Sequence, residues 1–127
     1  MATPQGIATT AAFLLGAVAL LSGVGHWIAV TMVAFGERGG FDARLARLLA
    51  IGFLPVGCGA VMLYGAWRVG ADTAVGLGIA SLASGIMAAT LIALWQSLST
   101  GPNGSAIGTG IGIALFAAES VAAWFVR

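Results

Sequence analysis

Two ionisable side chains, His26 and Glu119, interrupt long apolar runs of the sequence. An ionisable group inside a membrane costs a few kcal/mol to insert, so we expect each of these residues to have a structural or functional role. A carboxyl at position 119 is suited to carrying protons, binding a cation or acting as a general acid. Both residues are candidates for substrate binding. The structural alternative for Glu119 is a protonated or snorkelling side chain that is bonded to Ser120, Tyr64 or Arg68. The structural alternative for His26 is a hydrogen bond to a neighbouring helix, and we favour it.

A second set of polar side chains lies in and just before the short segment 68–72. Arg68 and Asp72 are four residues apart, and Tyr64 lies one helical turn before Arg68. If the helix continues through this segment, the two charges pair; otherwise they cap the turn. Together with Glu119, these three side chains would form a polar cluster at one membrane interface. That cluster is the best candidate for catalysis, and its four members are the candidate catalytic residues.

Other chemical signatures are missing from the sequence. We find no phosphate-binding loop, no metal-ligand spacing and no nucleophile triad, so no metal and no cofactor is expected. His26 is the single histidine, which excludes bis-histidine haem within one chain. Cys58 is the single cysteine and is interpreted as a small apolar residue. Five Arg, no Lys and four acidic residues give a net charge of +1, so no nucleic-acid partner is expected.

The elements that must position these residues follow from hydropathy. The 127 residues are 60% hydrophobic and 7% charged, whereas a soluble domain has about 25% charged residues. Four apolar runs, at about 7–35, 45–67, 73–98 and 105–126, each reach the roughly 20 residues that span a bilayer. Because they lack the alternation of barrel strands, they are predicted to be helices. The predicted fold is all-α, a single domain (1–127) that forms an integral membrane four-helix up-down bundle.

The breaks between the runs have local causes. Segment 36–40 combines charge with glycine, and Asp42 stands where the second helix would be capped. Segment 68–72 is a tight connection. Segment 99–104 is a strong turn signal, and Ser105 can cap the last helix. Short connections make sequence neighbours antiparallel neighbours in the bundle.

The arginines predict the orientation. Arg38, Arg44 and Arg47 lie at the first connection, whereas Arg68 and Arg127 lie on the other side. The positive-inside rule then places the first connection in the cytoplasm and both termini outside. The expected location is a multi-pass position in a bacterial inner (plasma) membrane, with the lipid bilayer as the main contact.

Small residues recur every four positions along several runs, and such rows let helix backbones approach closely in lipid. One interpretation is that the rows hold the four helices together; the other is that some of them receive an identical or a different subunit. The rows are Gly104, Gly108 and Gly112, predicted to be packing residues, with Ala106, Gly110 and Ala114 beside them, then Ala80, Ser84 and Ala88, and Ala8, Ala12 and Gly16.

Three segments carry a likeness to a known group of proteins: segment 13–23 (Phe-Leu-Leu-Gly through Leu-Ser-Gly), segment 48–52 (Leu-Leu-Ala-Ile-Gly) and segment 64–68 (Tyr-Gly-Ala-Trp-Arg). Through them the layout resembles small four-helix membrane proteins of the DoxX-like kind. It implies a membrane partner or a subunit of a larger redox assembly. DoxX-like proteins often carry an acidic residue in the second helix, where this chain has Pro-Val-Gly-Cys at 55–58. No site residue is therefore carried over.

Three functions fit these observations. The favoured one is a non-catalytic subunit or assembly partner of a larger membrane complex, which fits the small-residue rows and the absence of catalytic motifs. The second is a small transporter that works as a homo-oligomer and uses Glu119 as its coupling carboxyl. The third is a membrane-embedded enzyme for a lipophilic substrate, which would use the polar cluster. Whether the protein is an enzyme stays open at this point.

Overall fold

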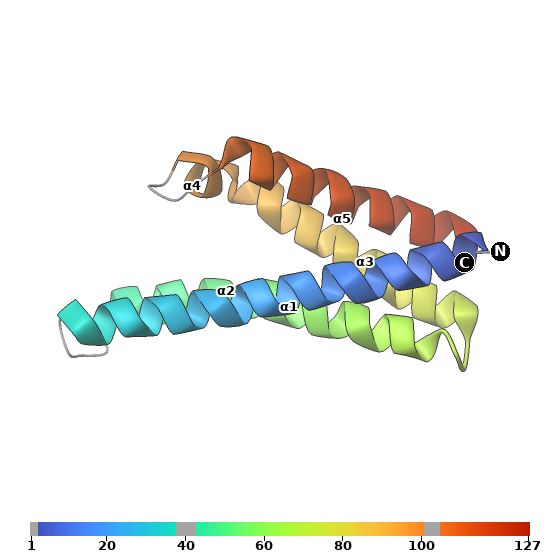
Figure 1. Cartoon of the computed structure of the whole chain (residues 1–127), viewed down its shortest axis with the longest axis horizontal. Helices are drawn as coiled ribbons and strands as arrows, with labels where there is room; N and C mark the ends of the chain where they lie inside the picture. Colours follow the sequence, from blue (N-terminus) through green and yellow to red (C-terminus); the bar gives the residue numbers. More distant parts are fainter. Residues whose placement is uncertain (1–2, 38–42, 101–104) are drawn as a thin grey trace.

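The computed structural model describes residues 3–37, 43–100 and 105–127. In these ranges the chain forms helices α1 (Pro4–Glu37), α2 (Ala43–Arg68), α3 (Thr73–Ala93), α4 (Trp95–Thr100) and α5 (Ala106–Val126). The four long helices run up and down beside one another, and α4 is a short turn of helix between α3 and α5 (Figure 1). This confirms the predicted all-α, up-down arrangement.

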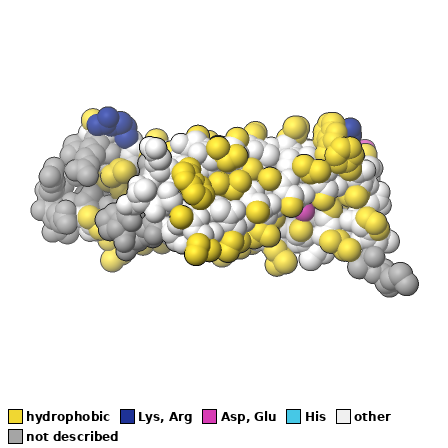
Figure 2. Space-filling view, turned by 90° about the horizontal axis from the view of Figure 1, so that it is seen from above, with side chains coloured by type: hydrophobic (Ala, Val, Ile, Leu, Met, Phe, Trp, Pro, Cys, Tyr) yellow, Lys and Arg dark blue, Asp and Glu magenta, His cyan; other side chains and the backbone are white. Residues whose placement is uncertain are grey.

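The long helices are apolar enough to be membrane spans. The candidate spans within the described ranges are Pro4–Val33, Leu45–Arg68, Thr73–Ala93 and Ala106–Val126, by length and composition. Each exceeds the roughly 20 residues that about 30 Å of hydrocarbon requires. Figure 2 shows apolar side chains spread along the length of the bundle, with basic side chains near its two ends. The chain therefore has the surface of a small four-pass membrane protein.

The third predicted run is divided in the structure. α3 ends at Ala93, because Leu94 leaves the helical conformation with φ of −97° and ψ of 12°, and α4 begins at Trp95. Neither glycine nor proline marks this break in the sequence. The Trp95 ring lies 3.9 Å from where a Cβ of Gly110 would stand, so α4 folds back over the start of α5. A tertiary contact thus accompanies the break that the sequence does not signal.

Side-chain caps begin three of the described helices. The Thr3 hydroxyl accepts a hydrogen bond from the Gly6 N–H (3.0 Å) at the start of α1. The Asp72 carboxylate accepts a hydrogen bond from the Val75 N–H (3.2 Å) at the start of α3. The Ser105 hydroxyl accepts from the Gly108 N–H (3.0 Å) at the start of α5, which confirms the predicted cap. Asp42, the predicted cap of the second helix, lies outside the described residues.

The helices pack as two pairs. α1 lies along α2 and α3 lies along α5, while α2 also contacts α3 (Figure 1). Backbones come close in the first pair, because a Cβ at Gly59 would stand only 2.6 Å from the carbonyl oxygen of Gly16. Two small-residue rows are buried in these contacts, as the first interpretation of them expects: Ala8, Ala12 and Gly16 on α1, and Ala80, Ser84 and Ala88 on α3.

The two pairs meet at the end that holds both termini and diverge toward the end that holds α4 (Figure 1). At the closed end, Ala8, Leu77 and Ala123 form a buried cluster. The Gln5 side-chain amide also donates a hydrogen bond to the Val126 carbonyl oxygen (3.0 Å), which ties the start of α1 to the end of α5. The two helix pairs are therefore joined directly at the end of the bundle that carries the termini.

Candidate functional site

Glu119 is buried inside the bundle, with only 4% of its surface exposed. It stands on α5 between Phe116 and Ala123, which belong to two different core clusters. Its Oε1 atom has no hydrogen-bond partner among the residues that the structure describes. A buried polar atom without a partner is costly, since most such groups in proteins are satisfied. Glu119 is therefore the polar side chain of this bundle that most needs an explanation.

The partners expected for a purely structural Glu119 are engaged or lie elsewhere. The Ser120 hydroxyl donates to the carbonyl oxygen of Ser81 (2.8 Å), and the Ser81 hydroxyl donates to the carbonyl oxygen of Ser120 (2.6 Å). Tyr64 and Arg68 are exposed on α2. No hydrogen bond or ion pair joins either of them to Glu119 in the described ranges. The structure thus leaves the carboxyl among apolar and small neighbours.

The other members of the predicted polar cluster lie at the surface. The Tyr64 ring is half-exposed and lies 6.1 Å from the Trp67 ring, centroid to centroid. Asp72 caps α3, and its N–H donates to the Arg68 carbonyl oxygen (2.9 Å), which is the turn-capping alternative of the two that the sequence left open. Within the described ranges, no hydrogen bond or ion pair joins the side chains of exposed Tyr64, Arg68 and Asp72 to one another or to buried Glu119.

His26 and Trp27 bind α1 to α2 through two successive carbonyl groups. Nε2 of His26 lies 2.7 Å from the Leu48 carbonyl oxygen, and Nε1 of Trp27 donates to the Leu49 carbonyl oxygen (2.7 Å). Because a carbonyl only accepts, the His26 Nε2 atom carries the hydrogen of this bond. This is the hydrogen bond to a neighbouring helix that the structural interpretation of His26 describes, and it occupies that ring nitrogen.

The glycine row of α5 is divided between two environments. Gly108 is exposed, and a Cβ there would meet only its own cap, Ser105. A Cβ at Gly112 would lie 3.3 Å from the Leu91 side chain of α3. Gly104 lies outside the described residues. Of the described glycines in this row, Gly112 faces another long helix and Gly108 does not.

The parallel row on α5 faces outward. It begins with Ala106, Gly110 and Ala114 and continues through Ala118 and Ala122 at the same spacing. All four alanines are exposed, whereas Gly110 is partly covered by Trp95. The extension of the row to position 122 was missed in the sequence, although the four-residue spacing was visible there. The serine pair of α3 and α5 was also missed, because serine pairing across helices has no sequence signature.

Comparison with known proteins identifies no family: no protein-family model, curated protein or solved structure matches the chain. Within the described ranges, no three His, Cys, Asp or Glu side chains gather in a way that could hold a metal ion. The function must therefore be argued from the arrangement of the helices and from Glu119.

Proposed function

We propose that this small four-pass membrane protein is a subunit or assembly partner of a larger membrane complex and that α5 contacts the partner. The observation that carries this proposal is the outward row of small residues on α5. It runs the length of the helix, and the exposed alanines that define it are Ala106, Ala114, Ala118 and Ala122. We call these four alanines the α5 outer row.

The α5 outer row can be compared with the small-residue rows on α1 and α3 of the same chain. Rows with the same four-residue spacing on α1 and α3 are buried against neighbouring helices, as Ala12 and Ala80 illustrate. In lipid, where hydrophobic attraction between helices is absent, close backbone approach at small residues is a main source of helix association. The α5 outer row, with Gly110 between Ala106 and Ala114, is also made of small residues at this spacing, but it has no partner helix within the described chain. A helix of another subunit would complete it.

α5 also leaves a large share of its span uncovered. It buries a smaller share of its span than α1, α2 or α3 does. Its neighbours in the bundle are chiefly α3 and, to a lesser extent, α1 and α4. The resemblance of segments 13–23, 48–52 and 64–68 to DoxX-like proteins supports the narrower form of the proposal, in which the larger complex is a redox assembly.

The test is native mass spectrometry of the protein extracted from its own membrane in mild detergent. We expect additional polypeptides to remain bound to the wild-type chain and to be lost from Ala118→Phe, which places a large ring in the α5 outer row. Ala29→Phe is the matched control, because Ala29 is an exposed alanine on α1. A wild-type chain that leaves the membrane without any partner, or an Ala118→Phe variant that keeps its partners, would contradict the proposal.

Glu119 favours a second candidate, an oligomeric small transporter that uses this carboxyl for coupling. The supporting observation is that the side chain is buried and that its Oε1 atom is unpartnered in the described structure. Proton-coupled flux into liposomes should then be abolished by Glu119→Gln, while the control Asp72→Asn keeps it. A subunit without transport activity tolerates Glu119→Gln and still retains its partners, so the same variant separates the two functions.

A further inference from the structure

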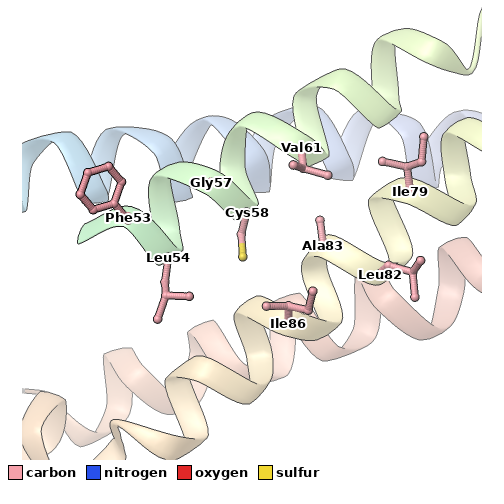
Figure 3. Close-up of a pocket in the computed structure, with 9 residues that line it drawn as sticks. All are labelled: Phe53, Leu54, Gly57, Cys58, Val61, Ile79, Leu82, Ala83 and Ile86. Atoms are coloured by element: carbon pink, nitrogen blue, oxygen red, sulfur yellow. The ribbon is translucent and has the colours of Figure 1, made fainter. Parts of the chain in front are cut away.

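An apolar groove of about 380 Å³ lies between α2 and α3 (Figure 3). Its floor includes Cys58 and Ala83, which are buried members of the central core cluster. Its rim includes Phe53, Leu82 and Ile86, each more than half exposed. In Figure 3 the Cys58 sulfur points into the space between the two helices. The groove is therefore closed toward the core and open toward the surroundings of the bundle.

The groove exists because α2 and α3 separate after a very close crossing. A Cβ at Gly65 would stand 2.8 Å from the Gly76 carbonyl oxygen, and a Cβ at Gly76 would stand 2.6 Å from the Gly65 carbonyl oxygen. From this crossing the two helix pairs diverge (Figure 1). Farther along, Gly57 contributes no side chain, and a Cβ there would meet nothing within 4 Å. The sequence thus leaves a hollow where larger side chains would have filled the gap.

The position of the groove decides what can fill it. Cys58 lies near the middle of the candidate span Leu45–Arg68, and Ala83 lies at the middle of Thr73–Ala93. The opening therefore faces the hydrocarbon layer of a bilayer rather than its headgroups. Water needs two to four polar partners to occupy a cavity, and the lining side chains are apolar apart from the Cys58 thiol. An empty hollow would forfeit dispersion contacts along both helices.

We propose that this groove binds one acyl chain of a membrane phospholipid. A volume of 380 Å³ is at the lower end of the range for ligand pockets, roughly 300–1,000 Å³. Its lining on α2 extends from Phe53 to Val61, which is about 12 Å at 1.5 Å per residue. The groove therefore holds a segment of one chain at mid-membrane depth, while the headgroup lies outside it. Cys58, Ala83 and the backbone at Gly57 form the contact surface.

Filling the groove from within tests this proposal. Gly57→Leu places a side chain in the hollow, and Gly25→Leu is the matched control, because a Cβ at Gly25 on α1 also meets nothing within 4 Å. The full chain is reconstituted in phosphatidylethanolamine and phosphatidylglycerol, extracted in mild detergent and analysed by native mass spectrometry. We expect one retained phospholipid per wild-type and Gly25→Leu chain, and about tenfold less in Gly57→Leu, equivalent to about 1.4 kcal/mol. Equal retention in the two variants would overturn the proposal.

A second measurement on the wild-type chain keeps the proposal testable even if Gly57→Leu fails to fold. A phospholipid with a photoreactive diazirine at the middle of one acyl chain is incorporated into the same vesicles and activated by light. Peptide mapping should find the crosslinks concentrated on segments 53–61 and 79–86, in excess over the exposed apolar face of α1. Crosslinks spread evenly over all exposed apolar residues would show annular lipid only and would contradict the proposal.

Discussion

Ser81 on α3 and Ser120 on α5 exchange hydrogen bonds, because the hydroxyl of each residue donates to the backbone carbonyl oxygen of the other, at 2.6 Å and 2.8 Å. Gly85 leaves the space for this pair, since a Cβ there would stand 2.9 Å from the Ser120 hydroxyl oxygen. In lipid, where water cannot replace a lost partner, such bonds fix the register of two neighbouring helices. Glu119 precedes Ser120 directly, so this register also sets where the Glu119 side chain lies relative to α3.

Removal of either hydroxyl should destabilise the α3–α5 pair. We expect Ser81→Ala and Ser120→Ala each to lower the free energy of unfolding by about 0.6 to 1.7 kcal/mol. The measurement is unfolding in mixed micelles with increasing dodecyl sulfate, and the double variant tests whether the two losses are coupled. Thr90→Ala is the control, because the Thr90 hydroxyl donates within its own helix to Ile86. Losses no larger than that of the control would show that the serine pair contributes no net stability.

A methyl group at Gly52 should disturb the contact between α1 and α2. A Cβ there would stand 2.2 Å from the indole nitrogen of Trp27, which donates to the Leu49 carbonyl. We expect Gly52→Ala to cost about 1–3 kcal/mol through overpacking and loss of this bond. Gly57→Ala, on the same helix and with free space around it, should be neutral or stabilising by up to about 1 kcal/mol. Chemical unfolding of both variants checks the prediction, and equal behaviour would contradict it.

The crossing of α2 and α3 should tolerate no side chain at Gly76. A Cβ there would lie 2.5 Å from the Val69 backbone nitrogen and 2.6 Å from the Gly65 carbonyl oxygen, and backbone atoms cannot rotate away. We expect Gly76→Ala to lower the free energy of unfolding by about 1–3 kcal/mol. Gly78→Ala is matched on the same helix, where the nearest atom is a flexible Arg127 carbon at 4.0 Å. Thermal stability in detergent distinguishes the two, and an unchanged Gly76→Ala midpoint would contradict the close crossing.

Asp72 should act as a helix cap rather than through its charge. We expect Asp72→Ala to cost about 0.5–2 kcal/mol, because the Val75 N–H loses its acceptor. Asp72→Asn keeps an acceptor oxygen in the same place and should retain most of the stability. The midpoints of unfolding of the two variants check this prediction. A loss in Asp72→Asn as large as in Asp72→Ala would instead assign the effect to the negative charge.

Much of the fold could be predicted because hydropathy and turn residues act locally. The four long helices follow from runs of apolar residues longer than a bilayer requires. The Ser105 cap follows from its place after a turn signal, and the internal rows at Ala12 and Ala80 follow from four-residue spacing. The break at Leu94 could not be predicted, because the neighbouring residues favour helix and only the contact of Trp95 with α5 accompanies it.

The candidate site was harder to predict than the fold. The sequence places Glu119 and Tyr64 near one interface but does not reveal the rotation of each helix about its axis. Packing sets that rotation, and it turns Glu119 into the bundle and Tyr64 toward the outside. The groove between α2 and α3 was equally hidden, because it depends on how far two helices separate after Gly65 and Gly76 rather than on any residue type.

The unequal lengths of the two helix pairs have a consequence for the surrounding membrane. The apolar part of α1, Pro4–Val33, is about 45 Å long, whereas α3 and α5, at 21 residues each, are about 32 Å long. The two pairs share one hydrocarbon layer, and an apolar helix longer than that layer is accommodated by tilting or by local thickening of the bilayer. We therefore expect the angle between the two helix pairs to widen in thinner bilayers and to narrow in thicker ones.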